Sequence, residues 1–136
     1  MTDLTRTALA IHRDLLERFD AWMDARGYAN RSEAMRDLIR RALIEQQWAE
    51  PDAAVVAVLS IIYDHHAHDL AQRLTEVQHR DHSAILCSQH VHLDHHLCME
   101  VILMQGTAGR LREMADAIIA TRGVKAGELT LMSRNV

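Results

Sequence analysis

The 136-residue sequence predicts an α+β fold in two parts, a βαα segment followed by a βαββαβ domain. Three observations predict it. Apolar residues recur at helical spacing in four stretches and alternate or run together in five others. Residues suited to helix ends flank several of the helical stretches. The single proline, Pro51, separates a histidine-poor first part from a second part that holds nine of the ten histidines.

The first part, residues 1–47, contains a short strand and two helices. Polar and apolar side chains alternate over part of residues 4–11, as they do in a strand. Residues 12–27 have helical apolar spacing and end at Gly27, a residue that suits a C-terminal cap. Residues 30–47 begin with Asn30 and Glu33 in the positions of a capping box. One strand and two helices cannot enclose a core, so we expect this part to need a partner chain.

Residues 48–53 are expected to form a linker, and residues 54–136 a second domain. A buried strand is predicted over 53–64, a helix over 66–81, a hairpin of two strands over 83–94 and 97–106, a helix over 107–123 and a strand over 128–133. The order βαββαβ is the split βαβ, ferredoxin-like pattern, to which ACT-type domains belong. This fold hosts many unrelated functions and assigns none by itself.

Composition narrows the classes of protein. The net charge of −4 indicates neither acidic partners nor a nucleic-acid-binding surface rich in basic residues. We expect no signal peptide, because the first residues include an acidic one and no long apolar core. We expect no membrane span, because no run of about 18 apolar residues occurs. Two cysteines are too few for a secreted disulfide scaffold, which favours a cytoplasmic, reducing setting.

Residues 79–101 hold six histidines and both cysteines. His90 and His92 would project from one face of a strand, and a tight hairpin at 94–96 would bring Cys98 close to them. Imidazole and thiolate ligands suit nickel, zinc or copper and disfavour magnesium or calcium. A fourth ligand must come from elsewhere. His79 is the nearest candidate, and three other histidines compete with it: His82, His95 and His96.

Two other interpretations of these residues stay open. The histidines could be solvated hairpin side chains beside a buried cysteine. Three ligands and a water could also form a catalytic zinc site. Asp94 and Glu100 are merely nearby carboxylates and not convincing general bases, so we expect no enzyme. A second histidine group, residues 64–69, offers His65 as a weaker metal candidate.

The first part also has the pattern of a ribbon-helix-helix DNA-binding dimer, in which paired strands enter the major groove. Arg6, Ala8 and Ala10 would face the bases, where Arg6 can bind guanine and the alanines can contact thymine methyl groups. The start of the second helix, Asn30, Arg31 and Ser32, could hold a phosphate. Alternatively, this part serves only dimerisation, an interpretation favoured by the absence of excess basic residues.

Taken together, the chain resembles the NikR family of nickel-responsive transcription regulators from about residue 6 to residue 132. The resemblance is carried by GYANRSEAMRDLIRRAL (27–43) and, more specifically, by VLSIIYDHHAHDLAQRL (58–74), VQH (77–79) and HVHLDHHLC (90–98). It implies a square-planar Ni(II) site, one per subunit, with His90, His92 and Cys98 from one chain and His79 from a neighbour.

The same resemblance implies a homotetramer, a dimer of dimers, that binds double-stranded operator DNA and represses nickel-uptake genes. It also places a further cation near the domain junction, at Glu33 and Asp37. The chain departs from the family at Ala8 and Ala10, where polar residues usually follow the arginine of the ribbon. The alternative from another class is a nickel, zinc or copper storage or delivery protein whose first part only dimerises.

Overall fold

A computed structural model describes residues 3–67 and 69–136, so what the sequence predicts for residues 1, 2 and 68 lies outside the described part. The chain forms two compact units, one ending at Arg40 and one beginning at Arg41. The boundary falls inside a helix, so that helix contributes its first turns to one unit and its last turns to the other.

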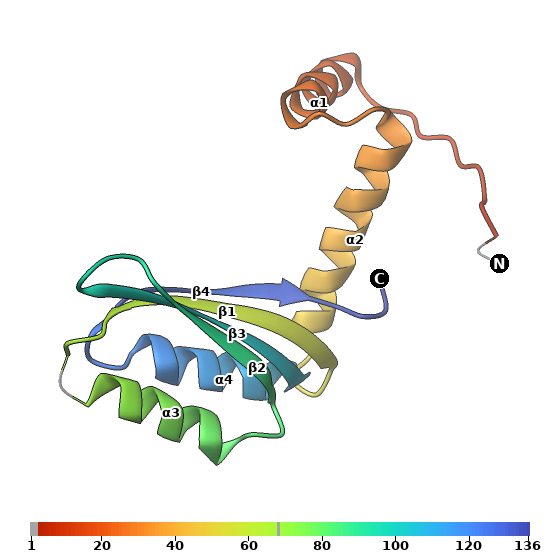
Figure 1. Ribbon diagram of the computed structural model, residues 1–136. Coiled ribbons are helices and arrows are strands. Elements are labelled where there is room, and N and C mark those ends of the chain that lie inside the picture. Colours follow the sequence, from red (N-terminus) through yellow and green to blue (C-terminus); the bar gives the residue numbers. More distant parts are fainter. Residues whose placement is uncertain (1–2, 68) are drawn as a thin grey trace. The chain divides into compact units, whose positions relative to one another are not determined.

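The first unit contains helix α1 (Arg13–Arg26) and the start of helix α2 (Arg31–Ala49) (Figure 1). Helix α1 ends at Gly27, which has φ of 75°, a left-handed conformation that glycine adopts without strain. The backbone N–H of Glu33 donates to Oδ1 of Asn30 at 2.9 Å. This bond confirms Asn30 as the predicted N-terminal cap.

Residues 3–12 form no strand within the single chain, although the sequence predicts one over 4–11. A ribbon strand of this kind bonds only to the same strand of a second chain, which a single chain does not supply. In the described part of this unit, Met23 and Ala34 are the buried hydrophobic residues, while Leu4 and Leu9 are 81% and 64% exposed. One copy of this unit therefore lacks a core of its own.

The second unit is a four-stranded antiparallel sheet in the order β2-β3-β1-β4, as the ferredoxin-like pattern predicts. Helices α3 and α4 cover one of its faces (Figure 1). The elements are β1 (Ala54–Asp64), α3 (Leu70–Arg80), β2 (Ile85–His92), β3 (Leu97–Thr107), α4 (Ala108–Ile119) and β4 (Val124–Met132). Alternate residues of β1 and β3 are buried beneath the helices.

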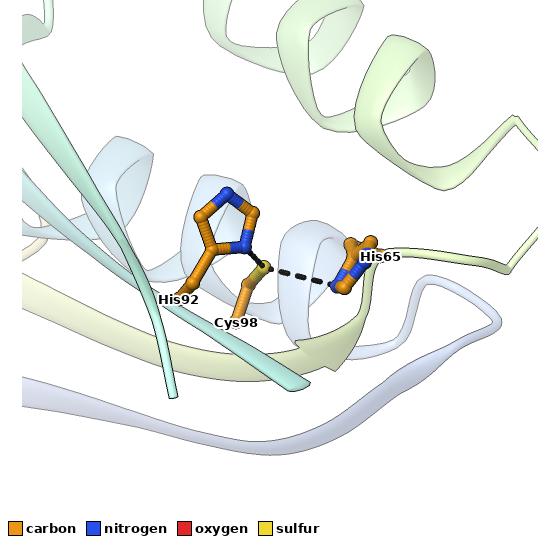
Figure 2. A group of neighbouring side chains, drawn as sticks. All are labelled: His65, His92 and Cys98. Carbon is orange, nitrogen blue, oxygen red and sulfur yellow. Dashed lines mark hydrogen bonds between the residues drawn. The ribbon is translucent and has the colours of Figure 1, made fainter. Parts of the chain in front are cut away.

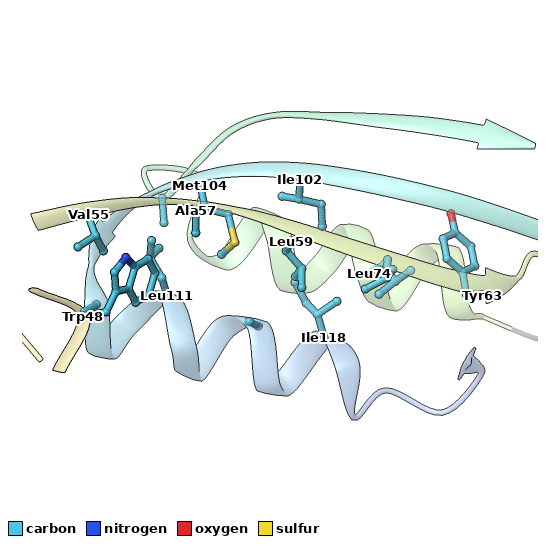
Figure 3. Close-up of a cluster of buried hydrophobic side chains, with 14 of the residues drawn as sticks. Trp48, Val55, Ala57, Leu59, Tyr63, Leu74, Ile102, Met104, Leu111 and Ile118 are labelled. Carbon is cyan, nitrogen blue, oxygen red and sulfur yellow. The ribbon is translucent and has the colours of Figure 1, made fainter. Parts of the chain in front are cut away.

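The core lies between the sheet and these helices and includes Leu59, Ile102 and Ile118 (Figure 3). It also includes Trp48, which is 2% exposed and donates its indole N–H to the Met132 carbonyl at 3.0 Å. Helix α2 thus continues to Ala49, into the stretch expected to be a linker. The burial of this tryptophan against the sheet accounts for the longer helix.

Helix α3 begins at Leu70, four residues later than predicted. Asp64 forms a turn before it, with its carboxylate accepting from the His66 N–H at 2.9 Å. Helix α4 ends at Ile119 and β4 begins at Val124, both earlier than predicted. Val124 pairs with Tyr63 on β1, and Gly123 makes the tight turn before it, where an added Cβ would lie 2.8 Å from Leu70.

Within the ranges described, no helix has both the length and the apolar composition that a membrane crossing requires.

Candidate metal centre

The hairpin between β2 and β3 holds the main candidate ligands in place. The Asp94 carboxylate accepts hydrogen bonds from the backbone N–H groups of His96 and Leu97, both at 2.7 Å. These bonds lower the pKa of Asp94, the one from His96 having the larger effect. The turn closes the hairpin so that His92 pairs directly with Cys98 across the two strands.

Cys98 lies at the centre of a group of three possible ligands (Figure 2). Its Sγ is 3.2 Å from Nδ1 of His92 and 3.4 Å from Nδ1 of His65. Among the described residues, His65, His92 and Cys98 form the group whose ligand atoms all lie within 4.8 Å of one another. Cys98 is buried, His65 is half-buried and His92 is exposed, so the group is open on one side.

His65 reaches this group because β1 ends beside the start of β3. Asp64 pairs with Leu97, and the backbone N–H of His65 donates to the His96 carbonyl at 3.0 Å. The sequence ranks His65 as a weaker candidate, since its group precedes a predicted helix, where a structural or N-capping role is an equal alternative to metal binding. Only the register of the two strands brings its side chain to that of Cys98.

The electrostatics of the group favour neutral ligands in the metal-free protein. Burial raises the pKa of the Cys98 thiol, and the charges of Asp64 and Asp94 raise it further. Burial likewise lowers the pKa of His65, with smaller contributions from His66 and His92. A thiol that keeps its proton must release it to bind a metal ion.

His90 lies on the same side of β2 as His92, with ring centroids 4.9 Å apart, as strand alternation predicts. Its Nδ1 is 3.4 Å from the Tyr63 hydroxyl. Burial raises the pKa of Tyr63 to about 12, with the Glu100 charge as a smaller cause, so this hydroxyl keeps its proton. His90 is therefore close to the group of three without belonging to it.

His79 lies in the last turn of α3 with an exposed side chain and outside the group of three. The three competing histidines, His82, His95 and His96, are also exposed. The ring of His82 contacts the His79 carbonyl, with Nδ1 and the oxygen 3.4 Å apart. The carbonyl of His95 contacts Nε2 of His66 at 2.8 Å.

The residues predicted to bind DNA lie in the first unit. Arg6, Ala8 and Ala10 are exposed in the extended segment before α1, and Ser32 is exposed at the start of α2. Arg31 binds Asp20 through two hydrogen bonds of 2.8 and 2.6 Å. This hydrogen bonding is the main cause of a lowered pKa of the Asp20 carboxyl and a raised pKa of the Arg31 guanidinium.

The residues predicted to hold a second cation, Glu33 and Asp37, lie one turn apart on α2. Asp37 already accepts from the Tyr28 hydroxyl at 3.0 Å and from the Arg40 guanidinium at 2.9 Å. Glu33 is exposed. A cation there would compete with Arg40 for the Asp37 carboxylate.

The donor atoms of the hairpin fit a late transition metal. A buried sulfur beside imidazole nitrogens is a soft, nitrogen-rich set that suits nickel, copper or zinc. The fold and these donors together define a class of protein, a two-helix unit with an exposed extended arm joined to a ferredoxin-like unit with a thiolate–imidazole metal centre.

Comparison with known proteins identifies the family. The model of the NikR C terminal nickel binding domain matches residues 56–132, and that of the ribbon-helix-helix protein, copG family, matches residues 5–46. The chain is 50% identical over 126 residues to a protein of Nitratidesulfovibrio vulgaris (strain DSM 19637 / Miyazaki F), covering 93% of this chain and 91% of the relative.

It is also 47% identical over 131 residues to a protein of Solidesulfovibrio magneticus and to one of Solibacter usitatus, covering 96% of this chain and 94% of each relative. All three bear the name "Putative nickel-responsive regulator". The chain belongs to the NikR family of nickel-responsive regulators, which are DNA-binding proteins and not enzymes. The resemblance noted from the sequence motifs is thereby confirmed.

Proposed function

We propose that the protein represses nickel-uptake genes, and that Ni(II) bound between subunits raises its affinity for operator DNA. One observation carries the proposal: the β2–β3 hairpin gathers His90, His92 and Cys98 at one end, while His79 points outward from α3 in the same chain. An exposed histidine of this kind is available to the metal centre of another subunit.

In this proposal His90, His92 and Cys98 of one chain and His79 of a neighbour hold one nickel ion per subunit. Three imidazoles and a thiolate form a strong-field set, with which Ni(II) favours a plane and Zn(II) a tetrahedron. When bound, the ion would supply a cross-link between two chains. His65, 3.4 Å from the sulfur, could bind an incoming ion before His79 completes the site.

Exposed apolar surfaces support the proposed tetramer. In the first unit a groove is lined by apolar residues from the arm and both helices, among them Leu9, Phe19 and Ile39. In the second unit the sheet face opposite the helices exposes Val91 at 47%, Leu103 at 38% and Met132 at 46%. We propose that the groove closes on a second arm to form the DNA-binding dimer, and that the sheet faces meet between dimers.

The proposed division of labour places DNA binding and dimerisation in residues 1–47, a connection at 48–53, and metal binding with tetramerisation in 54–136. Paired arms would present Arg6, Ala8 and Ala10 to the major groove. Asn30, Arg31 and Ser32 would approach the phosphates at the start of α2. Such a regulator acts on the chromosome, which places it in the cytoplasm.

In this proposal nickel changes the affinity of the first unit for DNA by thermodynamic linkage. The ion binds more tightly to the arrangement in which both arm pairs engage one operator, and DNA therefore binds more tightly to the nickel form. A further cation held by Glu33 and Asp37 would stabilise the same arrangement. Arg40 would then give up its bond to Asp37.

A metal-storage or delivery protein is the second candidate. Its support is that the Arg31 guanidinium, a proposed phosphate contact, is already bound bidentately by Asp20. In that case residues 1–47 only dimerise, and the metal centre binds its ion without any effect on DNA.

A gel-shift titration separates the two functions. Operator-length fragments from the promoters of the host's nickel-uptake genes are titrated with the wild type and with Cys98→Ala, each with and without nickel. The repressor proposal predicts nickel-dependent retardation by the wild type and none by the variant. Retardation of no fragment by the nickel-loaded wild type would favour storage, and full nickel-dependent retardation by Cys98→Ala would place the metal site elsewhere.

A further inference from the structure

The second unit contains a pocket at the end of the sheet opposite the candidate metal centre. It lies where β1 begins and β3 ends, since Ala54 pairs with Thr107, whereas the metal centre lies where Asp64 pairs with Leu97. From Ala54 to Asp64 the strand spans about 30 Å at the usual rise per residue. The pocket has a volume of about 450 Å³, which is within the range of sites for small molecules.

Two arginines from different elements line this pocket, which is called the arginine pocket below. Arg110 lies in the first turn of α4, and Arg134 follows the end of β4. Arg110 binds the Asp81 carboxylate through Nε and Nη2, and Nη2 also donates to Oγ of Ser83 at 3.1 Å. Arg134 donates from Nη2 to the neutral amide oxygen of Gln105 at 2.7 Å.

The charge of the arginine pocket is positive. Asp81 offsets the charge of Arg110, but within the described residues no carboxylate pairs with Arg134. The described residues that line the pocket include neither aspartate nor glutamate. One positive charge is therefore left in excess, in a chain whose net charge is −4.

Both guanidinium groups still have N–H groups to offer a ligand. A guanidinium has five such donors. In Arg110, Nη1 makes no hydrogen bond with the described residues, and in Arg134 the same holds for Nε and Nη1. Because Asp81 and Gln105 already restrict how the two side chains turn, less side-chain entropy is lost when a ligand binds.

The start of α4 adds a donor and a partial charge of the same sign. Thr107 precedes the helix and lines the pocket, and its hydroxyl makes no capping hydrogen bond, so it can donate to a ligand. The first two helical N–H groups, of Ala108 and Gly109, already donate to the carbonyls of Ala53 and Pro51, both at 2.9 Å. The helix end therefore contributes its positive partial charge, while the arginines and Thr107 supply the donors.

These features favour a phosphate group over other anions. A phosphate monoester has a charge of about −1.5 to −2 at neutral pH and offers three acceptor oxygens, whereas a carboxylate offers two. Two guanidinium groups and a hydroxyl can meet three oxygens. The pocket is also far larger than one small ion, since a water molecule takes about 30 Å³, and its lining includes the apolar Ala54 and Val55. The remaining space suits an organic group attached to the phosphate.

We propose that the arginine pocket binds a small phosphate monoester, with Arg110, Arg134 and Thr107 donating to the phosphate oxygens. The organic group rests against Ala54 and Val55. This inference goes beyond the proposed function and does not depend on the nickel site, because no residue of the pocket belongs to the metal centre. The pocket would give the chain a second ligand, of the opposite charge to a metal ion.

The variants that test the pocket each remove one kind of donor. Arg134→Met removes the charge in excess, and the amide of its partner Gln105 is left to water. Thr107→Val keeps the shape of the side chain and removes the hydroxyl. Arg122→Met is the matched control, because Arg122 is exposed, carries the same charge and precedes β4 at the far end of the sheet. All are full-length proteins, and circular dichroism verifies that each one folds.

Each protein is titrated by calorimetry with glycerol 3-phosphate, adenosine monophosphate and inorganic phosphate, in a buffer free of phosphate and nickel. The two esters differ in the size of the organic group, and inorganic phosphate lacks one, so the three affinities separate the sources of the phosphate. Amide chemical shifts in NMR spectra locate the bound ester. Neither measurement depends on nickel binding or on repression, so a failure here leaves the proposed function untouched.

We expect the wild type and Arg122→Met to bind one ester per chain with equal affinity, and more tightly than inorganic phosphate. The affinity for the ester should fall by about tenfold or more in Arg134→Met, as for the loss of a hydrogen bond to a charged group, and by a smaller factor in Thr107→Val. The shifts should concentrate at residues 105–110 and 133–135.

Three results would overturn the proposal. The first is that neither ester saturates the wild type at about 1 mM. The second is an equal loss of affinity in Arg122→Met and Arg134→Met, which would mean attraction to positive charge in general. The third is inorganic phosphate binding as tightly as both esters, which would exclude a role for the organic group.

Discussion

The pH dependence of nickel binding follows from the buried thiol. Burial raises the pKa of Cys98 above its ordinary value of 9.0, with Asp64 and Asp94 adding to the effect. The metal-free protein therefore carries a thiol between pH 7 and 8, and formation of the nickel–thiolate bond releases that proton. The same burial lowers the pKa of His65 below 6.5, so this neighbour stays neutral in that range.

The magnitude follows from one released proton. The apparent nickel affinity should rise with pH, by about tenfold per unit between pH 7 and 8, because the fraction of thiolate rises by that factor below the thiol pKa. The rise should level off only above the raised pKa. Removing a nearby negative charge with Asp64→Asn should lower the thiol pKa and raise the affinity at a given pH.

The assay is a competition titration against a chelator of known pH dependence. It is repeated at about pH 7, 7.5 and 8, a series that spans the one pH unit over which the tenfold change in affinity is expected. Calorimetry in buffers of different ionisation enthalpy counts the released protons directly. Cys87→Ala is the matched control, because Cys87 is exposed and lies outside the group of three. An affinity that does not change with pH in the wild type, or a slope that survives in Cys98→Ala, would refute the reasoning.

Three further predictions address the DNA contact, the core and the hairpin. Arg6→Ala should weaken operator binding by about 1–3 kcal/mol in gel shifts without changing nickel affinity; an equal loss on all sequences would argue against base contact. Trp48→Ala should lower the free energy of unfolding by about 3–5 kcal/mol in urea, and a change near zero would contradict its place in the core. Asp94→Ala should lower the Tm at neutral pH. Because the pKa of Asp94 is lowered below 3.8, this difference should shrink as acid protonates the wild-type carboxyl, and a constant difference would count against the turn.

Local signals in the sequence were sufficient for most of the fold. The cap at Asn30 was recognisable because it depends on a residue three positions away, and the structure contains that bond. The order of elements in the second unit followed from periodicity, and the sheet order agrees with the ferredoxin-like pattern. Element ends were less predictable, because tertiary contacts such as the pairing of Val124 with Tyr63 decide where a helix stops.

Burial of Trp48 was not predictable from its neighbours, because it follows two glutamines and precedes Ala49, Glu50 and Pro51, a stretch without a clear apolar pattern. Its position depends on contacts with Met132, 84 residues away. The burial of Glu100 could be predicted more readily from the sequence. It alternates with Cys98 and Ile102 on a strand, so it belongs to the face that the core covers, and a charge on that face indicates a specific partner.

For the metal centre, strand alternation and the short hairpin were enough to bring His90, His92 and Cys98 to one end of the sheet. The closeness of His65 to the sulfur was not apparent, since it depends on the register between β1 and β3. The role of His79 cannot follow from one chain, because a ligand supplied by another subunit leaves no contact within its own. That role stays a prediction from the family motif.

Complementation between two defective chains tests the shared nickel site most directly. A His79→Ala chain keeps the three hairpin ligands, and a Cys98→Ala chain keeps the histidine that a neighbour would need. The two are co-expressed with different tags, and mixed tetramers are isolated and titrated with nickel. We predict that neither variant alone gives the absorption of the planar nickel–thiolate complex and that the mixed tetramer does. The full spectrum in His79→Ala alone, or its absence from verified mixed tetramers, would contradict a site built from two chains.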